Sequence, residues 1–148
     1  MKTPPGTNVL FNTALKSDFL FWLAPKLARG VFAEAVLATP SSVVRAASVE
    51  DQARIASVSE HILPVSERRL GLLNDSAVVK SLSRYELERI RAPTLAISTA
   101  DDLYGTYDAA RYTAEHIPNA RFIGYPSGGH LWVGHHQEVL TEIATFLH

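Results

Sequence analysis

The residues best suited to chemistry in this chain of 148 amino acids are an acid pair and a histidine in its C-terminal part. Asp101 and Asp102 follow the short apolar run TLAIS, and His130 follows the run ARFIGY and the pair Gly128-Gly129. An aspartate that holds an imidazole in one tautomer lets the other ring nitrogen accept and return a proton. These residue types point to acid–base chemistry of the kind found in nucleophile–histidine–acid triads, with Asp102 and His130 as two of the three members.

Two predicted strands should bring this acid and this histidine to one edge of a sheet. Residues 94–98 are typical of a short, fully buried parallel strand, and residues 120–125 of a second one. Helical spacing over 106–117, with Thr106 as a plausible N-cap, predicts a helix between them. The order strand–helix–strand favours a right-handed parallel unit whose strand ends share one edge, where α/β folds bind ligands. A closing amphipathic helix is expected over 135–147.

The first half of the chain shows no strand periodicity and predicts a set of short helices. We expect an irregular start over 1–8 and helices over 9–37, 48–62, 65–73 and 75–82. Pro25 should kink or interrupt the first stretch, in which Asp18 is a plausible cap. Ser48 followed by Asp51 is a capping-box-like signal, and Asn74 is expected to end the helix that precedes it.

The C-terminal segment also resembles a known family. APTLAISTADD, followed by HIPNARFIGYPSGGHLWVGHHQEVLTEIATFL, is similar to the last part of α/β-hydrolase fold enzymes, over roughly residues 89 to 147. The resemblance implies an α/β fold with Asp102 as triad acid and His130 as triad base. Thr99 stands where the family has a glycine, which leaves Asp101 as a rival acid. Residues 1–89 would be a helical cap or lid, and residues 90–148 the C-terminal core segment, a parallel strand–helix–strand–helix unit.

The nucleophile that such enzymes carry is missing from this chain. It lies on a Gly-x-Ser-x-Gly elbow before the cap, and no serine here is flanked by glycines in that way. Ser127 is a poor substitute, because it lies three residues from His130 in a tight turn. The resemblance therefore implies a fragment or subunit of a serine hydrolase for an ester or related carbonyl substrate, inactive alone and completed by a nucleophile from another segment.

Two alternatives remain open at this level. The chain is a catalytically silent α/β-hydrolase-like interaction module if the elbow is lost altogether, and an acyltransferase or C–C hydrolase is a third reading, since fold does not fix function. Two strands alone make a weak sheet with open edges. We therefore expect either the missing N-terminal half or self-association to cover them, and a small ester-like molecule as substrate.

Four further residues are weighed for the site. Tyr104 follows the acid turn and Trp132 lies two positions after His130, so both are expected to line the pocket. His135 and His136 open the final helix without an acid at metal-ligand spacing, which favours surface or capping roles and no metal. No cofactor is expected.

Composition excludes several classes of function. The chain is 47% hydrophobic and 20% charged, as expected of a globular domain, and its net charge of -1 without a basic run argues against nucleic-acid binding. It has no cysteine, hence no disulfide or thiolate site. We expect no membrane span, because the most apolar window carries several charges, and no signal peptide. A cytoplasmic location is the expectation.

Overall fold

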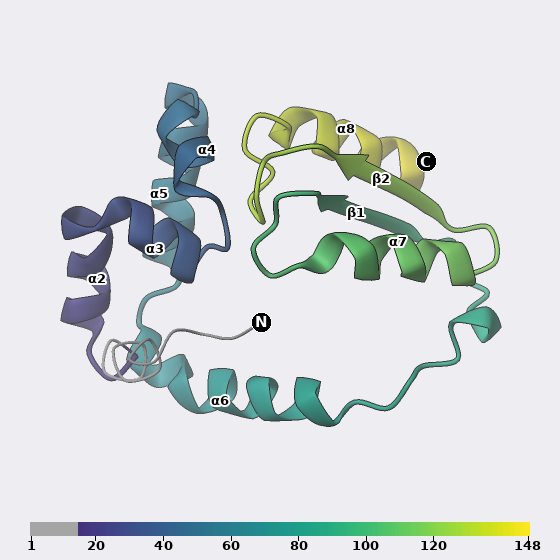
Figure 1. The fold of residues 1–148 in the computed structure, drawn as a ribbon, viewed down its shortest axis with the longest axis horizontal. Coiled ribbons are helices and arrows are strands. Elements are labelled where there is room, and N and C mark those ends of the chain that lie inside the picture. Colours follow the sequence, from purple (N-terminus) through teal and green to yellow (C-terminus); the bar gives the residue numbers. More distant parts are fainter. Residues whose placement is uncertain (1–14) are drawn as a thin grey trace.

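The computed structural model describes residues 15–148, with the side chains at positions 76 and 80 excepted. It has a mixed α/β fold in which helices precede a small parallel sheet (Figure 1). The expected irregular start over 1–8, and the first part of the helical stretch expected over 9–37, lie outside the described residues. The elements in chain order are α2 (Asp18–Leu27), α3 (Arg29–Ala35), α4 (Ser41–Ala46), α5 (Val49–His61), α6 (Val65–Ser81), the 3-10 helix η1 (Leu87–Arg89), β1 (Leu95–Thr99), α7 (Thr106–His116), β2 (Arg121–Tyr125) and α8 (His136–Leu147).

The start of α2 differs from the expectation. Ser17, not Asp18, is the N-cap, because its hydroxyl oxygen accepts a hydrogen bond from the Leu20 amide at 3.3 Å. Both residue types cap well, so the local turn decides between them. The Asp18 carboxylate instead accepts hydrogen bonds from the amide and the hydroxyl of Ser66, at 2.9 and 2.7 Å, and thereby ties α2 to the start of α6. Pro25 lies inside α2, and the break follows at Ala28.

The later helices confirm one capping prediction and correct one boundary. The Ser48 hydroxyl accepts from the Asp51 amide at 3.1 Å at the start of α5, as the capping pattern predicts. The prediction of two helices separated at Asn74 is wrong, since α6 runs without interruption to Ser81. An asparagine inside a helix costs only about 0.7 kcal/mol relative to alanine, which is too little to end a helix without a proline or a C-terminal glycine.

The predicted parallel unit is confirmed. β1 and β2 pair in parallel, from Leu95 opposite Arg121 to Thr99 opposite Tyr125. Helices α7 and α8 lie on either side of the two strands in Figure 1, and the carboxyl ends of both strands point toward α4 and α5. The parallel pairing therefore brings the turns that follow β1 and β2 to one edge, and the helical segment faces that edge.

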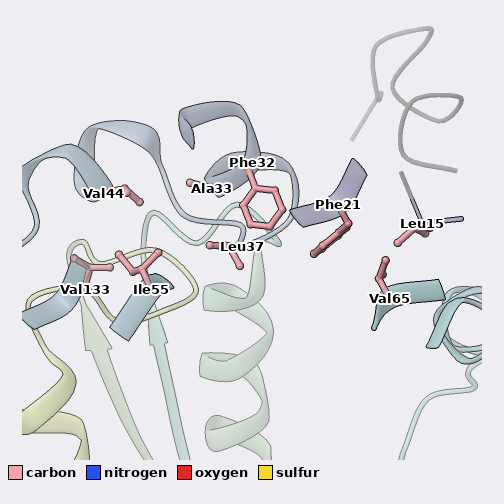
Figure 2. Close-up of a cluster of buried hydrophobic side chains, with 9 residues drawn as sticks. All are labelled: Leu15, Phe21, Phe32, Ala33, Leu37, Val44, Ile55, Val65 and Val133. Carbon is pink, nitrogen blue, oxygen red and sulfur yellow. The ribbon is translucent and has the colours of Figure 1, made fainter. Parts of the chain in front are cut away.

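The main apolar core lies in the helical segment rather than on the sheet. Phe21, Phe32 and Leu37 form its centre, and Phe21 and Phe32 meet edge to face with ring centroids 5.3 Å apart. Figure 2 shows Val133, from the loop after β2, beside Ile55 in the same cluster. This contact joins the loop that carries His130 to the helical core.

Within the described residues, we find neither a membrane-spanning helix nor a metal-binding cluster. None of these helices combines the length with the apolar character needed to cross a bilayer. No group of three or more His, Asp or Glu side chains in residues 15–148 is arranged to hold a metal ion.

Candidate functional site

Asp102 and His130 are in direct contact. The Asp102 Oδ2 atom lies 2.9 Å from Nδ1 of His130, in the turns that follow β1 and β2. The carboxylate side chain is only 3% exposed, whereas the imidazole is 46% exposed. Because a carboxylate only accepts hydrogen bonds, Nδ1 carries the proton and Nε2 is left on the accessible part of the ring.

Two further donors hold the Asp102 carboxylate. The Tyr104 amide donates to Oδ1 at 2.8 Å, and the Thr106 hydroxyl donates to Oδ2, the oxygen that also faces His130. The Ser98 hydroxyl lies 2.9 Å from the Thr106 hydroxyl and must donate to it, since the Thr106 proton is already used. The result is a chain of hydrogen bonds from β1 through α7 to the imidazole.

This arrangement shifts the ionisation of the acid. Burial by itself raises the pKa of the Asp102 carboxyl, but hydrogen bonds from His130, Thr106 and the Tyr104 amide outweigh it and bring the pKa below its ordinary value. Asp102 is therefore charged at neutral pH and suited to orient a histidine.

Thr106 was expected to cap α7, and that prediction is wrong. Gly105 occupies the N-cap position in the left-handed conformation, and no side chain caps the helix. Thr106 is the first helical residue, and its hydroxyl turns to Asp102 and Ser98 instead. A capping hydroxyl accepts a hydrogen bond from a helix amide, whereas the Thr106 hydroxyl donates to a charged carboxylate, and hydrogen bonds to charged groups are stronger than neutral ones.

The rival acid, Asp101, has a different role. Its two carboxylate oxygens accept hydrogen bonds from the amides of Gly128 and Gly129, at 3.3 and 2.8 Å. It has no contact with the imidazole comparable to that of Asp102. Asp101 therefore fixes the backbone turn that presents His130, and Asp102 contacts the ring itself.

The glycine turn also packs tightly against the segment that joins α3 to α4. The carbonyl oxygen of Ala38 accepts hydrogen bonds from the amides of Leu103 and His130, at 3.0 and 3.3 Å. Gly129 has a φ of +60°, and a Cβ atom built there would lie 2.4 Å from Cγ2 of Thr39. Only glycine permits this approach, so the residue before His130 sets how closely the two halves of the molecule meet.

The two aromatic residues expected near the site both lie close to the histidine. The Tyr104 ring meets the His130 ring edge to face, with centroids 4.8 Å apart, and the Tyr104 hydroxyl donates to the Val36 carbonyl at 2.9 Å. Trp132 lines a cavity of about 330 Å³ together with Asp102 and His130. Tyr104 is not among the residues that line that cavity, so its expected role there stays a prediction.

The cavity beside His130 is also lined by residues that sequence reasoning did not assign to the site. Its other lining residues are Arg54, Val58, Ile97, Ser98, Thr106, Leu131 and His136. Arg54 and Val58 come from α5, far from the acid and the histidine in sequence. The capping signal at Ser48 predicts α5 but gives no sign that the helix reaches this site.

No serine hydroxyl among the described residues forms a hydrogen bond with His130. The bonds of its ring and amide there are those to Asp102 and to Ala38. Ser127 lines a different groove, between α5 and α8, and Ser98 is 97% buried and bonded to Thr106 through its hydroxyl. Of the remaining histidines, His135 stacks on Tyr125 and His136 has no acidic partner in the described part of the chain.

Comparisons of the chain with protein-family models, with curated proteins and with solved structures gave no match, so this geometry is the basis for any statement about function.

Proposed function

We propose that this chain supplies the acid and the histidine of a serine-hydrolase-type triad, and that a separate segment supplies the nucleophile. The observation that carries the proposal is the 2.9 Å contact between Asp102 Oδ2 and His130 Nδ1 beside a cavity. The burial of the acid and the exposure of the imidazole fit a base that is oriented from behind and acts on its open side.

The proposed reaction is hydrolysis of an ester or a related carbonyl compound. His130 Nε2 takes the proton of the incoming serine hydroxyl while the serine oxygen bonds to the carbonyl carbon. The same nitrogen then gives that proton to the leaving group, whose bond to carbon breaks. In the second half of the reaction, His130 takes a proton from water while the water oxygen bonds to the acyl carbon. The bond to the serine oxygen then breaks, the serine regains its proton from His130, and the carboxylic acid is released. Asp102 stabilises the imidazolium in both halves of the reaction.

The proposed partner is the segment of an α/β-hydrolase fold that precedes this one, in line with the resemblance over residues 89–147. The sheet of the described residues has two strands, so β1 and β2 each leave one edge unpaired. Unpaired strand edges bind further strands readily. A strand added parallel to β1 brings its carboxyl end to the edge where Asp102 and His130 lie.

The test is ester turnover by the chain combined with the segment encoded directly upstream of it. With p-nitrophenyl acetate as substrate, Asp102→Asn and His130→Ala should each lower kcat/KM by about a thousandfold or more, with circular dichroism unchanged. Asp108→Asn is the control, because it changes an exposed carboxylate on α7 outside the cavity and should leave turnover unchanged. Unchanged turnover in either of the first two variants contradicts the proposal.

A catalytically silent interaction module is the second candidate. It is favoured by the absence, among residues 15–148, of a serine hydroxyl bonded to His130. In that case the combined chains form a stable complex, but ester turnover stays at the buffer rate. A monomer of 16.2 kDa in solution scattering that binds no upstream segment would contradict both candidates.

A further inference from the structure

We propose that the cavity beside His130 binds a small carboxylate with an apolar body, and that Arg54 and His136 hold the carboxylate group. The site is a property of the described residues themselves. The further step, that such a carboxylate marks the substrate class, rests on the proposed function.

The polar groups of this cavity divide into those that are satisfied and those that are not. Asp102 accepts from three donors, and the hydroxyls of Ser98 and Thr106 are bonded to each other. His136 Nδ1, by contrast, is buried without a hydrogen-bond partner in the described residues. A buried nitrogen without a partner is unfavourable unless a ligand or water satisfies it. His136 lines the cavity, so binding must turn this nitrogen of its ring toward the ligand.

Arg54 provides the cation. Its Nε and Nη2 atoms donate to Asp51 Oδ1 at 3.3 and 2.7 Å, whereas Nη1 makes no hydrogen bond to any described residue. The side chain is 20% exposed. A guanidinium carries five donors in a plane, so it can hold one carboxylate on one edge and bind a second on another. Arg54 is therefore anchored on one side and open on the other.

Asp51 fixes the position of this arginine. Its Oδ2 atom accepts a hydrogen bond from the Gly134 amide at 2.9 Å, in the loop that leads from His130 to α8. Helix α8 begins at His136, two residues later, without a side-chain cap. The positive end of its dipole adds to the charge of Arg54. The anchored cation, the unpartnered imidazole and the helix end thus belong to one connected structure.

The rest of the lining determines what is attached to the carboxylate. Val58, Ile97, Leu131 and Trp132 provide an apolar and aromatic wall. The volume of about 330 Å³ is at the lower end of the roughly 300–1,000 Å³ usual for ligand pockets, so the ligand is small. Asp102 is the acidic side chain in this lining, and its three donors occupy its oxygens; Asp51 is paired with Arg54.

Two tryptophans make the proposal testable by NMR. Trp132 lines this cavity, whereas Trp22 lines a separate cavity of about 270 Å³ in the helical segment, near Lys26 and Arg29. Titration of the full chain with sodium benzoate should shift the indole N–H signal of Trp132 to saturation and leave that of Trp22 in place. The variant Trp22→Phe assigns the two signals. A shift of Trp22 alone would overturn the proposal.

Ligand controls test the role of the charge. Benzamide has the shape of benzoate without its charge and should bind at least tenfold more weakly. Inorganic phosphate carries charge without the apolar body and should compete at least tenfold less well than benzoate. Equal binding of benzamide, or equal competition by phosphate, would overturn the proposed class of ligand.

Protein variants test the charge of Arg54. Arg54→Gln should weaken benzoate binding at least tenfold, whereas Arg54→Lys keeps a cation on α5 and should lose clearly less affinity. Arg45→Gln removes an exposed arginine from α4, outside the cavity, and should have no effect. Equal loss of binding in Arg54→Lys and Arg54→Gln would show that the cation does not hold the carboxylate and would overturn the proposal.

Binding and turnover measured on the combined chains separate this inference from the proposed function. Benzoate binding requires no nucleophile, whereas ester turnover does. Saturable binding without turnover in the combined chains would leave the carboxylate site standing and refute the hydrolase. Ester turnover without benzoate binding would support the hydrolase and refute the carboxylate site.

Discussion

The helical segment (residues 15–81) and the α/β unit (residues 95–147) differ in what they bury. The helical segment encloses large apolar side chains such as Phe21, Phe32 and Ile55. The α/β unit has fewer large buried apolar side chains, and it buries Ser98, Thr99 and Asp102 at the end of β1 and in the turn that follows; the buried polar residues of the helical segment are Thr39 and Asp51. Apolar burial stabilises a fold directly, whereas buried polar groups only avoid a penalty when they find partners. The helical segment holds most of the apolar core, and the α/β unit holds the contact between Asp102 and His130.

The two regions depend on each other through a small contact. Ala38 and Thr39 meet the turn that carries Gly129 and His130, and Val133 enters the helical core. The division at residue 89 that the sequence suggests stays a prediction, but the site itself crosses it, because Arg54 and His130 line the same cavity. The cavity and the contacts of the histidine turn therefore involve both regions.

The largest effect is expected from a change that forces the two regions apart. In Gly129→Ala the new methyl group would meet Thr39 at 2.4 Å, and the φ of +60° adds strain. We expect a loss of about 3 kcal/mol in the free energy of unfolding, measured by urea titration. Gly71→Ala is the matched control, since no atom lies within 4 Å of the added Cβ in α6. It should stabilise by about 0.5–1 kcal/mol. Equal stability of Gly129→Ala and the wild type would show that the contact is loose.

A smaller effect is expected from a change confined to the α/β unit. Thr106→Val removes the hydroxyl between Ser98 and Asp102 but keeps the shape of the side chain. In the chain combined with its nucleophile, kcat should fall about tenfold with KM little changed, since one charge-assisted hydrogen bond is lost. Thr106→Ser keeps the hydroxyl and should restore the rate. In the uncombined chain, the downfield Nδ1–H proton signal of His130 should weaken in Thr106→Val alone. An unaltered signal and rate would remove Thr106 from the set of positioning residues.

The smallest effect is expected in how the free energy of unfolding changes at low pH, and one carboxylate from each region tests it. Burial by itself raises the pKa of Asp51, but hydrogen bonds from Arg54 and the Gly134 amide outweigh it and lower the pKa below its ordinary value. For Asp102, hydrogen bonds from His130 and Thr106 outweigh burial in the same way. A lowered folded-state pKa contributes stability that is complete above the ordinary pKa of about 4 and is lost as the pH falls through the lower value. Asp51→Asn and Asp102→Asn should therefore each flatten the decline of unfolding free energy between about pH 4 and pH 2. Asp108→Asn, an exposed control on α7, should retain the wild-type decline. A wild-type decline in both of the first two variants would contradict the assignment.

The elements were largely predictable, and the errors have two causes. The strands near residues 95 and 121, the helix between them and the cap at Ser48 follow from local patterns. The expected break at Asn74 failed because a weak helix former does not end a helix by itself. Thr106 and Asp18 were assigned to caps because their types suit caps, but the Thr106 hydroxyl donates to Asp102 and the Asp18 carboxylate accepts from Ser66.

Sequence alone determined that Asp102 and His130 follow parallel strands, since strand order and spacing leave one edge for both. It did not determine which acid meets the ring. Asp101 and Asp102 are adjacent and chemically identical, and only the backbone turn directs one to the glycine amides and the other to the imidazole. Nor did it place Arg54 beside them, because that contact depends on how α5 packs against the loop at Gly134. Local patterns fix elements through short-range energies, whereas a site made from distant elements exists only after they pack.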